Sequence, residues 1–224
     1  MRWQHPVRGL VQPNEFIHIA EETGLIIPLG EWALNEACRQ ACEWPDDIRI
    51  AVNVSPVQFR SPGLSGAVLR AIETSGLAPE RLELEITESI FLEGADATVM
   101  LLHGLRAHGV RIALDDFGTG YSSLSYLRSF PFDKIKIDRS FIVELLDSNG
   151  SAAAIVRAIS DLAAAFGMET TAEGVEDEGQ LTELRAHGCS SVQGYLFSIP
   201  VPADEVGRIL LEIDARERPL ALVG

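Results

Sequence analysis

From residue 48 onward, short apolar runs rich in β-branched residues alternate with longer segments in which apolar residues recur at helical spacing. This alternation predicts parallel strands connected by helices, which defines the α/β class. The predicted strands cover residues 48–55, 81–88, 110–117, 134–138, 168–175 and 191–197. The predicted helices between and after them cover residues 63–75, 94–108, 139–146, 151–166, 177–187 and 203–214.

Two further helices are predicted ahead of the first strand, over 13–22 and 29–44. The second has an apolar stripe that is expected to face the core, formed by Trp32, Ala33, Leu34, Ala37 and Ala41. A closed barrel needs eight strands to remove its edges, and only six are predicted. The expected fold is therefore a TIM-type (β/α)8-like barrel that lacks its first two strands. Residues 1–214 would form one barrel domain, incomplete at the N-terminus, and 215–224 a C-terminal tail.

Charge and composition narrow the function. The chain has 33 acidic and 18 basic residues, a net charge of −15. This balance argues against binding of DNA or RNA polymers, because such binding depends on lysine and arginine neutralising phosphates. The three cysteines are too few and too scattered for a disulfide framework, and we expect reduced, largely buried thiols. No apolar run is long enough to span a bilayer and no signal peptide is evident, so a cytoplasmic protein without membrane contact is expected.

Polar side chains lie toward the C-terminal ends of all six predicted strands. They are Asn53, Glu85, Glu88, Asp115, Asp116, Lys136, Asp138, Glu173, Glu176 and Gln193. In a parallel barrel the carboxyl ends of the strands meet at one rim, so these side chains are expected to converge. Gathered carboxylates repel one another, and a divalent cation relieves that repulsion. Oxygen ligands without histidine or cysteine favour Mg²⁺ or Mn²⁺, and the Asp115-Asp116 pair suggests two ions.

Each of these residues taken alone has a structural interpretation. An Asp-Asp pair is often a turn or a helix cap, and Glu83 is expected to be a solvated or helix-facing charge. The two Ala-His-Gly strings, at 107–109 and 186–188, are expected to end helices with a left-handed glycine, so their histidines receive no metal role. Six successive strand ends with polar residues are harder to explain structurally. The string DFGTGYSSLS at 116–125 is interpreted as a mobile loop that orders over a ligand, although a plain connection would use similar residues.

Six strings in this order resemble the motif series of the EAL domain, a bacterial family that linearises cyclic di-GMP. They are NVS at 53–55, ELEITES at 83–89, DDFGTGYSSLSYL at 115–127, KIKIDRSF at 134–141, AEGVE at 172–176 and QGYLFS at 193–198. A single string such as DD or QG is common, whereas the ordered set is specific. The resemblance covers nearly the whole chain.

The resemblance implies a role for each matching position. Asn53, Glu85, Asp115, Asp116 and Glu173 would bind the metal, and Lys136, Glu173 and Asp138 would act in catalysis. Glu88 would anchor the loop that begins at Asp116, and Glu176 and Gln193 would support the substrate. Arg2 matches the arginine that follows the Glu-Ala-Leu tripeptide and would grip a substrate phosphate.

Two departures from the family pattern qualify this interpretation. The glutamate of the Glu-Ala-Leu motif would lie ahead of Met1, and it is a metal ligand in the family. We therefore expect the 224-residue chain alone to be a poor enzyme, with activity reduced about 10- to 100-fold or more, as measured losses of metal-site support indicate. The second departure is Ile199, where the family often has a basic residue, which would loosen a rim contact.

The resemblance implies hydrolysis of cyclic di-GMP to linear pGpG by a phosphodiesterase that uses two Mg²⁺ or Mn²⁺ ions. One alternative is a catalytically degenerate module that serves as a cyclic di-GMP receptor or a protein-interaction domain. Another is an unrelated metal-dependent barrel hydrolase, which would require the motif series to be a coincidence. A homodimer, and an upstream sensor or GGDEF domain in a longer chain, are usual in the family, and the sequence decides neither.

Overall fold

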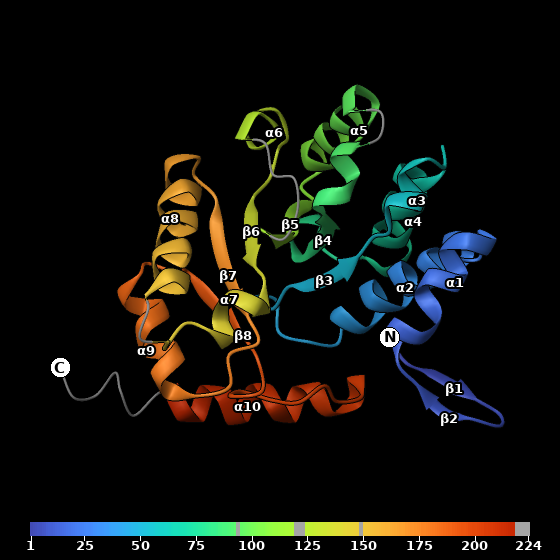
Figure 1. Cartoon of the computed structure of the whole chain (residues 1–224). Coiled ribbons are helices and arrows are strands. Elements are labelled where there is room, and N and C mark those ends of the chain that lie inside the picture. Colours follow the sequence, from blue (N-terminus) through green and yellow to red (C-terminus); the bar gives the residue numbers. More distant parts are fainter. Residues whose placement is uncertain (93–94, 119–123, 148–149, 218–224) are drawn as a thin grey trace. The chain divides into compact units, whose positions relative to one another are not determined.

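The structure is a computed structural model that describes residues 1–92, 95–118, 124–147 and 150–217 (Figure 1). Two compact units are distinguished within it. The first comprises Met1–Asp115 and Gly120–Asp133, and the second comprises Asp116–Thr119 and Lys134–Gly224. The expectation of one barrel domain over 1–214 stays a prediction, and most of the predicted tail lies outside the described residues.

The first unit begins with a hairpin that the sequence pattern did not predict. β1 (Trp3–His5) and β2 (Gly9–Val11) pair in antiparallel fashion, with Trp3 opposite Val11. Each strand has three residues, too few for an alternation to be recognised. Helices α1 (Pro13–Thr23) and α2 (Ile26–Ala41) follow. The left-handed Gly24 (φ 76°) ends α1 and allows α2 to begin earlier than predicted.

The apolar stripe of α2 faces the core only in part. Leu34, Cys38 and Ala41 are almost fully buried, as expected of core positions. Trp32, however, was predicted to belong to this stripe and is 56% exposed, so that prediction is wrong. The reason is geometric: α2 buries Gly30, Leu34, Cys38 and Ala41, a row of three- and four-residue steps, and Trp32 lies off that row.

The first unit then alternates strands and helices. Its elements are β3 (Ile50–Asn53), α3 (Pro56–Phe59), α4 (Leu64–Ser75), η1 (Pro79–Arg81), β4 (Leu82–Thr87), η2 (Glu88–Leu92), α5 (Ala95–Ala107), β5 (Arg111–Phe117) and α6 (Leu124–Ser129). β3 pairs with β4, and β4 with β5, both in parallel. α4 packs against α2 and α5, which covers the apolar side chains of these helices. β5 ends at the boundary between the units.

The second unit continues the same alternation (Figure 1). It contains β6 (Lys134–Ile137), α7 (Arg139–Val143), α8 (Ser151–Ala165), β7 (Glu169–Glu173), α9 (Glu178–Ala186), β8 (Ser191–Gln193), η3 (Ala203–Glu205) and α10 (Val206–Glu217). β6 pairs with β7, and β7 with β8, again in parallel. α8 packs against β6 and β7. The strands follow the order β3-β4-β5 in the first unit and β6-β7-β8 in the second, so all six predicted strands and the α/β class are confirmed.

Alternation along the strands separates the core from the polar face. On β4, Leu82, Leu84 and Ile86 are at most 1% exposed, and the glutamates lie between them. Side chains two residues apart lie on the same face of a strand, so one face is apolar and the other carries the acidic groups. The same separation holds for Ile135 and Ile137, which flank Lys136. Burial of these aliphatic side chains is the main force that holds each strand in place.

Glycines end the helices as predicted. Gly109 (φ 94°) and Gly188 (φ 77°), the last residues of the two Ala-His-Gly strings, are left-handed. The prediction for β8 was wrong at its C-terminal end, because the strand stops at Gln193 instead of continuing to 197. The chain turns there: Phe197 N–H donates to Gly194 O at 3.1 Å. Among the described residues, no helix is long and apolar enough to cross a membrane.

Candidate functional site

The strand register places the predicted ligands of the first unit on one face of its sheet. Asn53 is the register partner of Glu85, and Glu85 is the partner of Ala113, which precedes Asp115 by two positions. Register partners in parallel strands share a face, as do residues two apart, so Asn53, Glu85 and Asp115 lie on the same side. The amide Nδ2 of Asn53 donates to Glu85 Oε2 at 2.8 Å. Glu85 and Asp115 are buried, each 7% exposed.

Glu83 also lies on this face, contrary to expectation. It was expected to be a solvated or helix-facing charge, but it is 3% exposed and shares the face of Glu85, two residues on. Its carboxylate forms an ion pair with Arg111, its register partner on β5, at 3.4 Å. A glutamate in this setting is buried because an arginine is supplied one strand away. Sequence spacing alone does not show which strand supplies that partner.

In the second unit, Lys136 of β6 and Glu173 of β7 form a close ion pair. The ammonium Nζ lies 2.6 Å from Glu173 Oε1, and the lysine side chain is 5% exposed against 21% for the glutamate. Lys136 is the register partner of Thr171, and Glu173 lies two residues beyond Thr171 on the same face. A buried ammonium is stable only beside an anion, so the sequence places these two groups together through the register of β6 and β7.

Asp116 occupies an unusual backbone conformation at the end of β5. Its φ is +54°, the only positive φ of a residue other than glycine in the described chain. This conformation costs a non-glycine residue about 1–3 kcal/mol, although aspartate tolerates it better than most. On a regular strand, Asp115 and Asp116 would face opposite sides. The positive φ rotates the backbone, so that both carboxylates serve one cluster.

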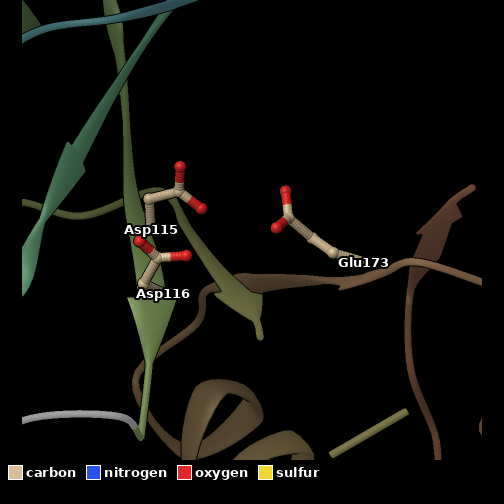
Figure 2. Close-up of side chains that lie close together, drawn as sticks. All are labelled: Asp115, Asp116 and Glu173. Atoms are coloured by element: carbon tan, nitrogen blue, oxygen red, sulfur yellow. The ribbon is translucent and has the colours of Figure 1, made fainter. Parts of the chain in front are cut away.

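Three carboxylates meet at this point. One oxygen each from Asp115, Asp116 and Glu173 lies within 4.8 Å of the other two. Figure 2 shows the carboxylate of Glu173 facing those of the two adjacent aspartates. Such a group carries a charge of up to −3, against which Lys136 supplies one positive charge at Glu173. The oxygen-only donors and the surplus negative charge fit a hard divalent cation such as Mg²⁺ or Mn²⁺.

Three further predicted residues lie near the ends of β6, β7 and β8. Asp138 caps α7, where its Oδ1 accepts hydrogen bonds from the backbone N–H of Ser140, at 3.0 Å, and from the Ser140 hydroxyl. Glu176 forms an ion pair with Arg139 at 2.7 Å. Gln193 is exposed and is the register partner of Glu173. The proposed catalytic role of Asp138, and the substrate roles of Glu176 and Gln193, stay predictions.

Arg2 and Glu88 are the remaining predicted positions. Arg2 is exposed, and its Nη1 donates to the Met1 carbonyl at 2.9 Å. Glu88 begins η2 and is 8% exposed. The loop that Glu88 was expected to anchor is described only through Gly118 and again from Leu124, so its predicted movement falls outside the described residues. Arg139 was not singled out by sequence reasoning, although a basic residue directly after Asp138 was a signal.

The cysteines carry no sign of chemistry. The three thiols are free. Cys38 is fully buried, and burial raises its pKa to about 11 from the ordinary value of 9.0. Cys42 is exposed, so the expectation of largely buried thiols holds for Cys38 and not for Cys42. A thiol that stays protonated at neutral pH is a poor nucleophile and a poor metal ligand.

Comparison with known proteins identifies the family. The family model of the EAL domain matches residues 1–200. "Uncharacterized protein y4lL" of Sinorhizobium fredii is 53% identical over 220 residues, which are 97% of this chain and 26% of that protein. The bifunctional diguanylate cyclase/cyclic di-GMP phosphodiesterase MucR of Pseudomonas aeruginosa is 47% identical over 210 residues, 92% of this chain and 30% of MucR. The chain thus spans less than a third of the length of either relative.

Solved structures agree with the sequence relatives. The PaMucR phosphodiesterase in complex with c-di-GMP superimposes with a TM-score of 0.87 at 47% identity, over 92% of this chain and 84% of that one. A manganese/cyclic di-GMP complex of BlrP1 from Klebsiella pneumoniae matches with a TM-score of 0.74 at 31% identity, over 86% of this chain and 49% of that one. These structures confirm the predicted TIM-type α/β fold class. The chain therefore belongs to the EAL domain family.

Proposed function

We propose that this chain is a divalent-metal-dependent phosphodiesterase module that hydrolyses cyclic di-GMP to linear pGpG. The observation that carries the proposal is the cluster of Asp115, Asp116 and Glu173, with the ammonium of Lys136 at 2.6 Å from Glu173. A member of the EAL family with these groups together has the donors that phosphodiester hydrolysis needs. The proposal is supported by MucR, whose name states this activity, and by the cyclic di-GMP complex of its phosphodiesterase domain.

Five oxygen-bearing side chains would hold the metal: Asn53, Glu85, Asp115, Asp116 and Glu173. Two ions of Mg²⁺ or Mn²⁺ would supply Lewis-acid stabilisation of the phosphate and activation of water. The fit rests on the donors themselves, which are carboxylate and amide oxygens, and two of them, Glu85 and Asp115, are buried. The manganese complex of BlrP1 supports this assignment.

The protein groups would divide the remaining work. Glu173 can accept a proton from the attacking water, because a carboxylate held at a fixed position is a suitable general base. Lys136 holds that carboxylate and presents a buried positive charge to the phosphate, which offsets part of the −15 charge of the chain. Asp138 would orient the start of α7, and Gln193, beside Glu173 in the register, would orient substrate or water. Arg2 would bind a substrate phosphate through its guanidinium.

A paired measurement of binding and turnover tests the proposal. The purified chain is incubated with cyclic di-GMP, with and without Mg²⁺ or Mn²⁺, and pGpG is separated by chromatography while binding is followed by calorimetry. We expect binding and metal-dependent formation of pGpG. Binding with no turnover in either metal would contradict the enzyme assignment and favour the receptor alternative, and absence of both would reject the substrate.

Matched variants locate the activity. Asp116→Asn and Glu173→Gln each remove one charge from the cluster and are expected to lower turnover about 10- to 100-fold or more, the range measured for losses in metal-site support. Asp161→Asn is the control, because this residue lies on α8 with its side chain 76% exposed. Turnover that survives both cluster substitutions would place the chemistry elsewhere in the chain.

A further inference from the structure

Arg139 lies across the turn that follows Glu173. Its guanidinium Nη2 is 2.7 Å from Glu176 Oε1. Its aliphatic part covers Gly174, whose φ is +74°: a Cβ at that position would lie 2.7 Å from Arg139 Cδ and would overlap Cγ. A side chain at Gly174 and the present position of Arg139 therefore exclude each other. We call Gly174, Val175 and Glu176 the 174–176 turn.

Other elements hold the same turn from different directions. Val175 N–H donates to Gln193 O at 3.0 Å, and Leu196 N–H donates to Val175 O at 3.0 Å. Gly194 permits this approach, because a Cβ there would lie 2.7 Å from the carbonyl carbon of Val175 and would overlap its N and O. Glu176 N–H donates to Gln180 Oε1 of α9 at 2.8 Å. β8 and α9 thus fix the backbone of the turn, and Arg139 is its contact from α7.

The position of Arg139 is itself set by local structure. It is the first residue of α7, and Asp138 caps that helix through the Ser140 N–H at 3.0 Å. An N-cap fixes the direction in which the first helical side chains leave the backbone. β6 carries Lys136, three residues before Arg139, so one short segment supplies both Lys136, which contacts Glu173, and Arg139, which contacts Glu176.

We propose that Arg139 is a positioning residue, which ties the 174–176 turn to the start of α7 and thereby keeps the Glu173 carboxylate aligned with Lys136. This inference rests on the proposed function, because it assigns Arg139 to the same site. Arg139 touches neither Glu173 nor Lys136 in any contact described, and it acts through the turn. This role requires a long cationic side chain, because the aliphatic stem of Arg139 contacts Gly174 and its charge contacts Glu176.

The solvent exposure of the Arg139–Glu176 ion pair distinguishes a positioning role from a purely structural one. The Arg139 and Glu176 side chains are 58% and 47% exposed, and exposed ion pairs contribute little to global stability. Removal of Arg139 should therefore shift Tm by about 2 °C or less. By contrast, loss of a group that supports a metal-site ligand lowers activity or metal affinity about 10- to 100-fold. A large functional effect with a small stability effect is the expected signature.

Three substitutions distinguish the contribution of the aliphatic stem of Arg139 from that of its positive charge. Arg139→Ala removes both, Arg139→Met keeps an apolar stem over Gly174, and Arg139→Lys keeps a positive charge. Arg157→Ala is the matched control, because Arg157 is an exposed arginine of the same unit on α8, paired only loosely with Asp161 at 3.9 Å. Each protein is assayed for hydrogen exchange of the peptide 169–180, for Mn²⁺ affinity by calorimetry, and for single-turnover hydrolysis of cyclic di-GMP.

In Arg139→Ala and Arg139→Met, exchange in peptide 169–180 should quicken about tenfold and hydrolysis or Mn²⁺ affinity should fall about tenfold. Arg139→Lys should recover most of both, and Arg157→Ala should match the parent. Unchanged exchange in this peptide would overturn the inference, and so would faster exchange with unaltered hydrolysis and Mn²⁺ affinity. If the parent chain neither binds nor hydrolyses cyclic di-GMP, the proposed function fails. The exchange and Mn²⁺ measurements then still decide the role of Arg139.

Discussion

Substitution of Lys136 should destabilise the metal-free chain far more than substitution of its partner, Glu173. Lys136→Met removes the one positive charge at 2.6 Å from Glu173 and keeps the volume of the side chain. Asp115, Asp116 and Glu173 then remain within 4.8 Å of one another with less neutralisation. Glu173→Gln also breaks the ion pair, but it removes one of the three negative charges. The two substitutions therefore act in opposite ways on the carboxylate cluster.

Coulomb's law gives the size of the difference. At an effective dielectric constant of about 20, two unit charges at the 4.8 Å upper limit repel by ~3.5 kcal/mol, so Asp115 and Asp116 together repel Glu173 by at least ~7 kcal/mol. Under the same conditions the attraction of Lys136 at 2.6 Å is ~6 kcal/mol. These terms nearly cancel for Glu173→Gln, which should change the free energy of unfolding by about 1 kcal/mol or less. Lys136→Met should cost about 3 kcal/mol, as loss of one partner of a buried pair does.

Urea unfolding in a chelating buffer measures both variants and the double variant. The double-mutant cycle formed by these three variants and the parent chain should give a coupling free energy of about 1–3 kcal/mol between Lys136 and Glu173. Addition of Mn²⁺ should reduce the loss in free energy of unfolding that Lys136→Met causes, because a bound cation replaces the lost positive charge. The reasoning is refuted if Glu173→Gln costs as much as Lys136→Met, or if Mn²⁺ leaves that deficit unchanged.

Three further predictions concern other parts of the chain. Gly194→Ala should destabilise the chain by about 2–3 kcal/mol, because the added Cβ would overlap the backbone of Val175. Gly104→Ala, where the added Cβ on α5 meets open space, should stabilise the chain by about 0.5–1 kcal/mol. The midpoints of urea unfolding compare the two variants. Arg81→Ala should cost about 3 kcal/mol by the same measurement, because the 8% exposed side chain satisfies carbonyl groups over residues 41–48. Arg39→Ala, with a side chain that is 54% exposed, should leave the urea midpoint nearly unchanged. Burial raises the pKa of Cys38 to about 11, so the folded state retains a proton that the unfolded chain loses above about pH 9. Stability should therefore fall as pH rises from 9 to 11, and Cys38→Ala should lack that part of the loss; an equal decline in both proteins would contradict the assignment.

The period of the apolar residues was enough to predict every strand of the parallel sheet. Strands such as β4 and β6 bury aliphatic side chains at every second position, and that signal is local in the chain. The hairpin β1–β2 was missed because three-residue strands give too short a pattern. The C-terminal end of β8 was predicted too long, since the contact between Gly194 and Val175 that turns the chain joins segments 19 residues apart.

The identities of the candidate site residues were equally local, and the motifs that resemble the family series named them. Asp115 and Asp116 illustrate the limit of this information, because adjacent residues on a regular strand point in opposite directions. The positive φ of Asp116 brings their carboxylates together, and no feature of the sequence string states a dihedral angle. Likewise, Glu83 was expected to be solvated or to face a helix, and only the register with β5 shows that Arg111 is its partner.

The sequence by itself determined the α/β alternation, the places of the six parallel strands, the candidate acidic and amide ligands and the family. Tertiary structure alone decided which polar side chains contact one another: Lys136 with Glu173, Asn53 with Glu85, and Arg139 with Glu176. The physical reason is that periodicity and helix capping depend on near neighbours in the chain. Charge pairing depends instead on strand register, and hydrogen bonds and burial fix that register across dozens of residues.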